Sequence, residues 1–285
     1  MMNKRTKQKF AFFFFRLFSI IIVGILIAIL GFIAVNGIKV INWEFLSSMP
    51  KEGMTEGGIF PAIVGTCYLI IGSMIFAVPL GVMAAIYTVE YAGNGKFVRF
   101  IRMMTNNLAS IPSIVFGLFG MALFVKGLNF GDSIIAGSLT LGLLALPLII
   151  RTSEEALKAV PESYRTGSYA LGATKLQTIR KVVFPCALPN ILTGIILSIS
   201  RVSGETAPIL FTVAAYFLPS LPDSIFSQAM ALPYHLYVLA TSGTDIEASR
   251  PMAYGTALVL VVIVLFFNLT ATLLRQKLSK NMKNK

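Results

Sequence analysis

Long uncharged runs alternate with short polar segments along this chain. A helix needs roughly 20 residues to cross about 30 Å of hydrocarbon. Six uncharged runs of at least 18 residues approach or exceed that length: 17–35, 59–89, 103–125, 133–150, 182–200 and 252–274. The pattern predicts an all-α polytopic membrane protein with about six transmembrane helices.

Composition supports a membrane protein. The chain is 56% hydrophobic and 13% charged, with a mean hydropathy of +0.79. A soluble domain of this size needs more charged residues to cover its surface. The first apolar run is too long for a cleavable signal peptide and lacks a small-residue cleavage site, so we interpret it as a retained helix.

The net charge of +12 follows the predicted topology. With the N-terminus in the cytoplasm and six spans, 19 Lys and Arg residues fall on cytoplasmic segments, and only Lys39, Lys51, Lys126 and Arg250 fall outside. This positive-inside bias places both termini in the cytoplasm. Membrane topology therefore accounts for the charge, and no nucleic acid partner is needed.

The segment 206–244 leaves the number of spans open. Its two apolar stretches either both cross the membrane, which makes eight spans, or neither does. Four prolines interrupt them: Pro208, Pro219, Pro222 and Pro233. We favour six spans, with a bent helix end and interfacial pieces outside, because irregular backbone at membrane depth needs protein around it. The single histidine, His235, is interpreted as interfacial.

Catalytic and metal-binding signatures are missing from the sequence. No Gly-x-x-x-x-Gly-Lys-Ser/Thr phosphate loop occurs, so the chain is not expected to hydrolyse ATP by itself. One histidine excludes most metal and histidine-based catalytic sites. Cys67 and Cys186 fall near opposite membrane faces, too far apart for a disulfide. We expect no enzyme, no metal and no cofactor in this chain.

The longest predicted cytoplasmic loop, 151–185, carries a pattern of its own. Apolar residues recur at helical spacing after Pro161 and again over 175–184. The loop is predicted to present an apolar knob with a basic rim to a cytoplasmic partner. An amphipathic helix lying on the membrane surface explains the same pattern equally well.

Arg201 is the one charged residue expected deep in a span. Counted from Pro185 at about 1.5 Å per residue, it lies roughly 24 Å into the membrane. A charge there is costly and marks a substrate path by default. Glu205 follows four residues later and can pair with it, so a purely structural ion pair is the alternative. Ser203 and Thr206 add hydroxyl groups, and the guanidinium matches phosphate oxygens.

Two motifs carry a family resemblance. Residues 164–174, read with Phe184 and Pro185, resemble the cytoplasmic EAA loop of permeases in binding-protein-dependent ABC importers. Gly172 matches the central glycine of that loop and Pro185 its terminal proline, whereas Thr166 and Gly167 stand where the family has Glu and Ala. The resemblance implies a type I importer permease fold. It also implies a coupling helix, including Ala173, that docks on a separate ATPase subunit.

The sequence Arg-x-x-Gly-Glu-Thr-Ala-Pro at 201–208 resembles the A-type permease subunit of phosphate-specific importers, as do 61–66 and 146–152. The resemblance implies that Arg201, Glu205 and Arg151 serve phosphate passage, although Arg151 is equally well explained as a positive-inside anchor. It also implies a second homologous permease, two ATPase subunits that bind ATP, an external phosphate-binding protein, and a location in the cytoplasmic membrane.

Three regions are expected: the N-terminus, first helix and external loop (1–58), the permease core (59–275) and a basic tail (276–285). Alternative functions are a sulfate or molybdate permease and, more distantly, a passive anion channel.

Overall fold

The computed structural model describes residues 4–51, 54, 56–93, 95–218, 220–242 and 246–283. Its long helices are α1 (Lys4–Gly37), α3 (Phe60–Ile86), α4 (Lys96–Ala109), α6 (Ile134–Lys158), α9 (Phe184–Ser203) and α12 (Ile246–Lys283). Shorter helices are α2 (Trp43–Ser47), α5 (Ser113–Gly120), α7 (Glu162–Ala170), α8 (Lys175–Thr178), α10 (Ala207–Leu210) and α11 (Leu232–Thr241). Three π-helical segments are η2 (Tyr87–Tyr91), η3 (Met121–Gly127) and η4 (Ile179–Val183). Strands β1 (Pro50–Lys51) and β2 (Glu56–Gly57) form a small antiparallel pair.

The described residues contain five helices long and apolar enough to cross a membrane, and six if one bent pair counts as a span. The five are Phe12–Gly37, Phe60–Tyr91, Ile134–Lys158, Lys175–Ser203 and Ile246–Lys277. The chain is therefore a multi-pass membrane protein, as its apolar runs predict.

The predicted run 103–125 does not form one straight helix. Helix α4 ends at Ala109, and α5 with η3 continues at an angle of 103°. Pro112 explains the break, because proline removes a backbone donor and disfavours helical geometry in the residue before it. The region that the sequence predicts as the third span is thus a pair of helices with a sharp bend between them.

The predicted cytoplasmic loop 151–185 does not end at Pro185. The helix runs without a gap from Lys175 through η4 and α9 to Ser203. Proline in the first turn of α9 lacks an i→i−4 donor, and the wider π-helical turn of η4 comes directly before it.

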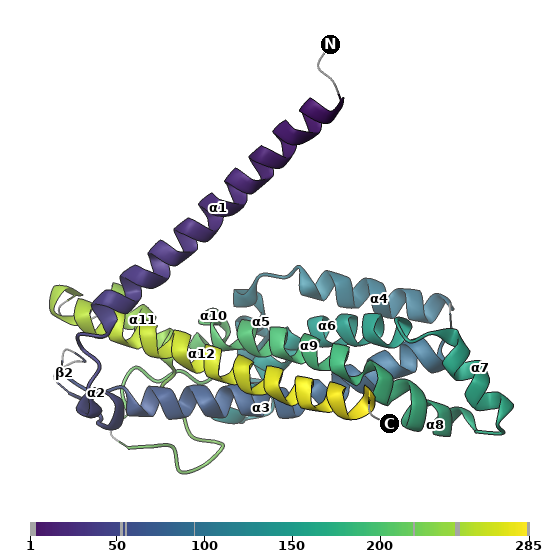
Figure 1. The fold of residues 1–285 in the computed structure, drawn as a ribbon. Helices are drawn as coiled ribbons and strands as arrows, with labels where there is room; N and C mark the ends of the chain where they lie inside the picture. The colour runs from purple at the N-terminus through teal and green to yellow at the C-terminus, as the bar shows by residue number, and fades with distance from the viewer. Residues whose placement is uncertain are drawn as a thin grey trace.

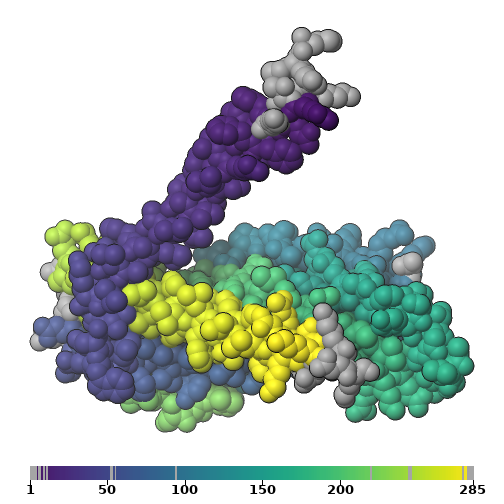
Figure 2. All heavy atoms as spheres, viewed as in Figure 1, coloured from purple at the N-terminus to yellow at the C-terminus, as the bar shows by residue number. Residues whose placement is uncertain are grey.

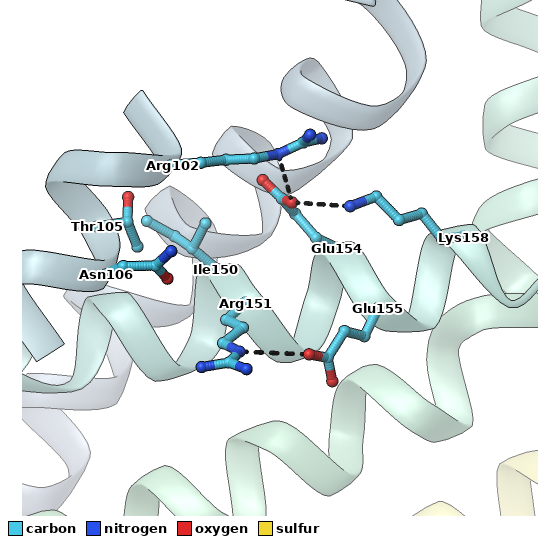
Figure 3. A pocket seen from close by; sticks show the side chains of 8 residues that line it. All are labelled: Arg102, Thr105, Asn106, Ile150, Arg151, Glu154, Glu155 and Lys158. Carbon is cyan, nitrogen blue, oxygen red and sulfur yellow. Dashed lines mark hydrogen bonds and ion pairs between the residues drawn. The ribbon is translucent and has the colours of Figure 1, made fainter. Parts of the chain in front are cut away.

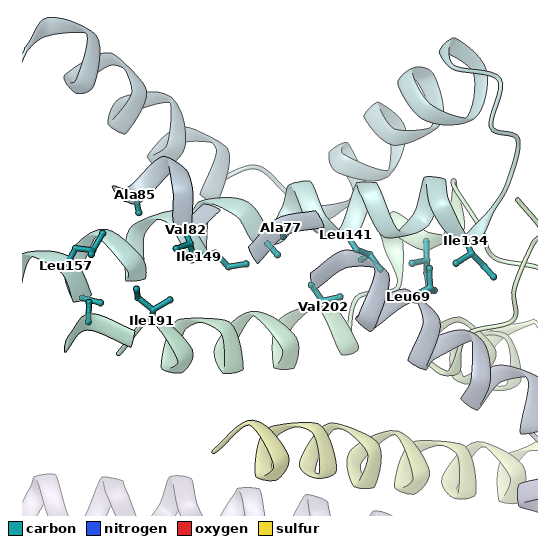
Figure 4. Close-up of a cluster of buried hydrophobic side chains, with 14 of the residues drawn as sticks. Leu69, Ala77, Val82, Ala85, Ile134, Leu141, Ile149, Leu157, Ile191 and Val202 are labelled. Atoms are coloured by element: carbon teal, nitrogen blue, oxygen red, sulfur yellow. The ribbon is translucent and has the colours of Figure 1, made fainter. Parts of the chain in front are cut away.

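Helices α3, α6 and α9 form the centre of the bundle, and their buried side chains make one continuous core (Figure 4). Leu69 and Ala77 of α3 pack with Leu141 and Ile149 of α6, and Ile191 of α9 joins them. Small residues let the helices approach closely, as membrane helices require. A Cβ at Gly194 of α9, for example, would overlap Thr152 of α6.

Helix α1 stands apart from this bundle. It leaves the body at a steep angle, and most of its length is free of other helices (Figures 1 and 2). Only its C-terminal end packs on α12, where Gly37 lies against the Tyr254 carbonyl and Phe32 stacks edge-on with Tyr254. Its apolar side chains from Phe12 onward are almost all exposed.

The segment that follows α9 favours six spans over eight. Its described residues, which leave out Pro219 and 243–245, hold no helix long enough to cross a membrane. The segment folds back onto the bundle: the Leu232 N–H donates to Thr66 Oγ1 over 2.8 Å, and the Ser133 N–H donates to the Thr212 carbonyl over 2.9 Å. His235 is 2% exposed within it, so its side chain is buried in the protein and does not lie on the surface.

Gly65 permits this return of the chain, and its replacement tests the packing. A Cβ at position 65 would overlap the backbone carbonyl oxygen of Met230, which cannot rotate away. Gly65→Ala is therefore expected to destabilise the purified protein by about 1–3 kcal/mol, measured as a lower midpoint of thermal unfolding in detergent. Gly31→Ala on exposed α1, where no atom lies within 4 Å of the new Cβ, is the control and should not lower the midpoint.

Candidate functional site

Arg201 lies in the last turn of α9 and pairs with Glu205. Its Nε is 3.7 Å from Glu205 Oε1, and the two side chains are 37% and 18% exposed. The predicted pair is present, but the two residues do not share a helical face, because α9 ends at Ser203. Beyond it the chain turns through Gly204, whose N–H donates to the Arg201 carbonyl over 3.3 Å. A cation in the last turn also favours the negative end of the helix dipole.

The neighbouring candidates differ in what they offer a ligand. Ser203 is buried, and its Oγ donates to the Ile199 carbonyl over 2.6 Å, so its hydroxyl proton is already used. Thr206 is half-buried and begins the turn into α10. Gly204 is exposed, and no atom lies within 4 Å of the position that a Cβ would take there. The part of the site that a ligand can reach is therefore the Arg201 side chain and the adjacent backbone of Gly204.

The cavity beside this ion pair is too small for a substrate. Glu205 and Ser203 line it, and its volume is about 10 Å³. A cavity needs about 10–15 Å³ to admit a single water, so this cavity cannot hold a tetrahedral oxyanion. The Arg201 side chain is not part of its lining and stays partly exposed, which suits one wall of a larger space.

Arg151 belongs to a different level of the bundle. It pairs with Glu155 one turn later in α6, with Nε 3.3 Å from Oε1, and both side chains are exposed. Its neighbour Thr152 lies against Gly194, seven residues before Arg201 along α9. At 1.5 Å per residue the two arginines are separated by about 10 Å along the helix axis. The structure thus does not bring Arg151 to the Arg201 site.

Arg151 lines a cavity of about 220 Å³ between α4 and α6 (Figure 3). The lining residues are Arg102, Thr105, Asn106, Ile150, Arg151, Glu154, Glu155 and Lys158. Three are cationic and two anionic, so the cavity carries a small positive excess.

Glu154 organises this cavity, although the sequence did not single it out. Its buried carboxylate accepts hydrogen bonds from Arg102 Nε (3.1 Å), Lys158 Nζ (3.2 Å) and Thr88 Oγ1 (2.7 Å). It thereby ties α4 and the end of the α3 span to α6. The spacing of Glu154 and Lys158 at i,i+4 was the available signal, although it did not reveal the partners from other helices.

The loop region between α6 and α9 forms a compact tip at one end of the bundle (Figure 1). Gly172 connects α7 to α8 with φ of +80°, a left-handed conformation that favours glycine. Thr174 and Gln177 form a capping box at the start of α8, and Ala173 between them and Gly172 is half-buried.

The apolar knob predicted from the sequence is present at this tip. Leu171 is 90% exposed, and Tyr164 and Leu176 are also exposed. We call these three residues, with the exposed Thr166 and Gly167, the coupling surface, after the role that the family resemblance implies for this loop. The two departures from the family pattern therefore lie on the outside of α7, where Thr166 Oγ1 donates only to carbonyls of its own helix.

Arg165 does not belong to the predicted basic rim, because it is 8% exposed, whereas Lys175, Arg180 and Lys181 of the same loop are exposed. Its Nη2 lies 2.8 Å from Glu90 Oε1 in η2, and this hydrogen bond raises the pKa of Arg165 above its usual value. Glu90 ends a 31-residue uncharged run, a signal that could have marked it as a buried partner.

Among the described residues, no group of three or more His, Cys, Asp or Glu side chains is placed to hold a metal.

Solved structures share this architecture. The MetNI methionine ABC transporter in an inward-facing conformation matches with a TM-score of 0.60 and 20% identity, over 78% of this chain and 94% of that one. A bacterial ABC transporter that imports the acidic polysaccharide alginate matches with a TM-score of 0.65 and 16% identity, over 94% and 97%. The fold is that of a type I ABC importer permease.

Sequence comparison agrees with the fold. The model of the family described as "Binding-protein-dependent transport system inner membrane component" matches residues 77–284, and the chain belongs to that family.

Two relatives illustrate the range within it. The probable ABC transporter permease protein YqgI of Bacillus subtilis is 35% identical over 98% of this chain and 100% of its own length. The phosphate transport system permease protein PstA of Mycobacterium leprae is 39% identical over 94% and 88%.

The adjacent residues Glu154 and Glu155 allow a matched test of the hydrogen bonds that Glu154 accepts. Glu154→Gln removes the charge that two cations share, and we expect the free energy of unfolding to fall by more than about 1 kcal/mol. Glu155→Gln breaks only an exposed pair with Arg151, which is worth about 0.2–1 kcal/mol. Thermal unfolding in detergent checks this, and equal midpoints for the two variants would contradict the structural role of Glu154.

Proposed function

We propose that this chain is one permease half of an ATP-driven importer that carries inorganic phosphate across the cytoplasmic membrane. The family membership supports an importer, and relatives named as phosphate transport permeases support the substrate. The observation that carries the proposal is Arg201, an accessible guanidinium at the end of a central spanning helix.

Arg201 suits a transient contact with phosphate. Its guanidinium offers a planar fork of donors that matches two oxygens of a tetrahedral anion. The long 3.7 Å contact with Glu205 shields the charge and leaves donors free for an incoming anion. A single arginine opposed by a carboxylate gives weak binding, which permits release on the other side.

Because Arg201 is partly exposed, a second protein surface is needed to enclose a pathway beside it. We infer that a homologous permease covers this face and encloses the pathway between the two subunits. The coupling surface presents apolar side chains to an ATPase subunit on each permease, and an external phosphate-binding protein delivers the substrate. ATP binds to the ATPase partner, and this chain contributes no catalytic residue.

The charge distribution supports the orientation. In the sequence, most Lys and Arg residues fall in the two terminal segments and in the segments that include α7 and α8, which form the tip at one end of the bundle (Figure 1), so we place this tip and both termini in the cytoplasm.

Transport then follows alternating access. ATP binding draws the two ATPases together, the coupling surfaces move with them, and the pathway opens outward to accept phosphate. Hydrolysis reverses the movement. The energy comes from the ATPase interface, because a ligand shifts two states only by its difference in affinity for them.

Sulfate or molybdate would fit the arginine equally well on physical grounds, so competition decides the substrate. Vesicles that carry the complete complex are expected to accumulate labelled phosphate with ATP, and excess sulfate or molybdate should not compete. Displacement by either anion, or ATP-independent flux typical of a passive channel, would contradict the phosphate assignment.

Arg201→Gln is expected to lower phosphate uptake at least tenfold, because the neutral amide loses the charged fork, while the complex still assembles. Arg151→Gln is the comparison that separates the two interpretations of Arg151. If Arg151→Gln inserts less well but each inserted complex takes up phosphate normally, Arg151 is an anchor. If uptake per inserted complex falls tenfold, Arg151 is a pathway residue. Full uptake by Arg201→Gln would refute the pathway role.

A further inference from the structure

The guanidinium of Arg165 connects the coupling helix α7 to two spanning helices. Its Nη2 contacts Glu90 Oε1 in η2 at 2.8 Å and donates to the Leu157 carbonyl of α6 at 3.0 Å. Its Nη1 donates to the Val160 carbonyl at 2.9 Å and to Glu162 Oε2 at 3.3 Å. Its Nε lies 3.3 Å from Glu90 Oε1. All three nitrogens are therefore engaged.

This arrangement is specific to arginine. Leu157 lies in the last turn of α6 and Val160 follows the end of this helix, where carbonyls have no donor four residues further along a continuing helix. A planar fork can satisfy these carbonyls and a carboxylate at once, whereas the three donors of a lysine all radiate from one nitrogen and cannot reach partners so far apart. The Glu90 side chain is 5% exposed, so most of this ion pair is shielded from solvent.

Other polar contacts of α7 stay close to the tip. Ser168 Oγ lies 2.9 Å from Thr178 Oγ1 and ties α7 to α8, and Thr166 bonds within its own helix. Within the described residues, the side-chain hydrogen bonds that join α7 to the ends of the α3 and α6 spans all use Arg165. A displacement of α7 relative to these two spans therefore acts on this side chain, whereas Leu176 on α8 is already continuous with η4 and α9.

The connected helices lead to the pathway. Glu90 lies in η2, the π-helical end of the α3 span, and such wide turns often occur at functional positions. Helix α6 packs along α9, whose last turn carries Arg201. A contiguous route of packed elements thus runs from α7 through Arg165 to α3 and α6, and from α6 to Arg201.

We propose that Arg165, held by Glu90, is the positioning residue that transmits movement of the ATPase-bound α7 helix to the spanning helices. The inference rests on the proposed function, because it assumes that an ATPase docks on the coupling surface. Arg165 does not contact substrate. It converts a movement of the tip into a shift of α3 and α6, and without it α7 moves on its own.

The test measures coupling in the assembled complex. With Arg165→Gln, and with Glu90→Gln, the complex should assemble and hydrolyse ATP within twofold of wild type. Phosphate moved per ATP should fall at least tenfold. Arg165→Lys should lose coupling too, because the charge alone does not replace the fork. Arg180→Gln, an exposed arginine near the same tip, is the matched control and should stay coupled.

Gly172→Val provides a contrast between docking and transmission. A β-branched residue at φ of +80° is strained and distorts the coupling surface itself. This variant should lose the ATPase subunit on purification, whereas Arg165→Gln should retain it.

A second readout does not depend on the substrate. Addition of a non-hydrolysable ATP analogue should change backbone hydrogen exchange of η2 in the wild-type complex but not in Arg165→Gln. If the wild type shows this change and moves no phosphate, the proposed function fails and the transmission role stands. If Arg165→Gln keeps the exchange response or normal coupling, or if assembly, hydrolysis and transport fall together, the transmission role is overturned.

Discussion

Hydrocarbon contains no water, and this lack of solvent governs the structure more than any single contact. Every backbone donor and acceptor at membrane depth needs a partner within the protein, and every charge needs either a partner or access to water. Long helices satisfy the first requirement locally. Where α9 ends at Ser203, the irregular chain that follows lies against other helices and contributes Val213, Ala229 and Ala231 to the core. The segment after α9 is supported in this way, because Thr66 accepts a hydrogen bond from its backbone and the Ser133 N–H donates one to it.

The same constraint sorts the charges into two kinds. Glu154 and the Arg165–Glu90 pair are buried and fully partnered, so they hold helices together. Arg201 is accessible, sits at a helix end and makes only a long contact with Glu205. A buried, saturated charge resists exchange with a ligand, whereas a poorly paired charge on an open face invites it. Under the proposed function, this difference separates the charges that hold the helices together from the charge that would line the pathway.

Much of the fold could be predicted from the sequence, since a run of 18 or more uncharged residues has few alternatives to a membrane helix. The Arg201–Glu205 pair and the exposed coupling surface were also predictable, because a lone deep arginine needs a partner and an apolar loop at helical spacing needs a surface. The shape of the third span was not, because the effect of Pro112 depends on how α5 packs against α10. The buried position of Arg165 was not predictable either, because a basic residue in a loop is exposed by default.

The sequence by itself determined the class of protein, the approximate number and the order of the spans, and the tip that faces a partner. These features follow from local hydrophobicity and short motifs, which act over one or two helical turns. Only the tertiary structure decided which charges are buried, since Glu90 and Arg165 lie 75 positions apart and Thr88 and Glu154 lie 66 apart. It also separated Arg151 from Arg201, because the register of α6 against α9 depends on close packing at Gly194 and Thr152. Such contacts arise from packing between distant segments, which no local pattern encodes.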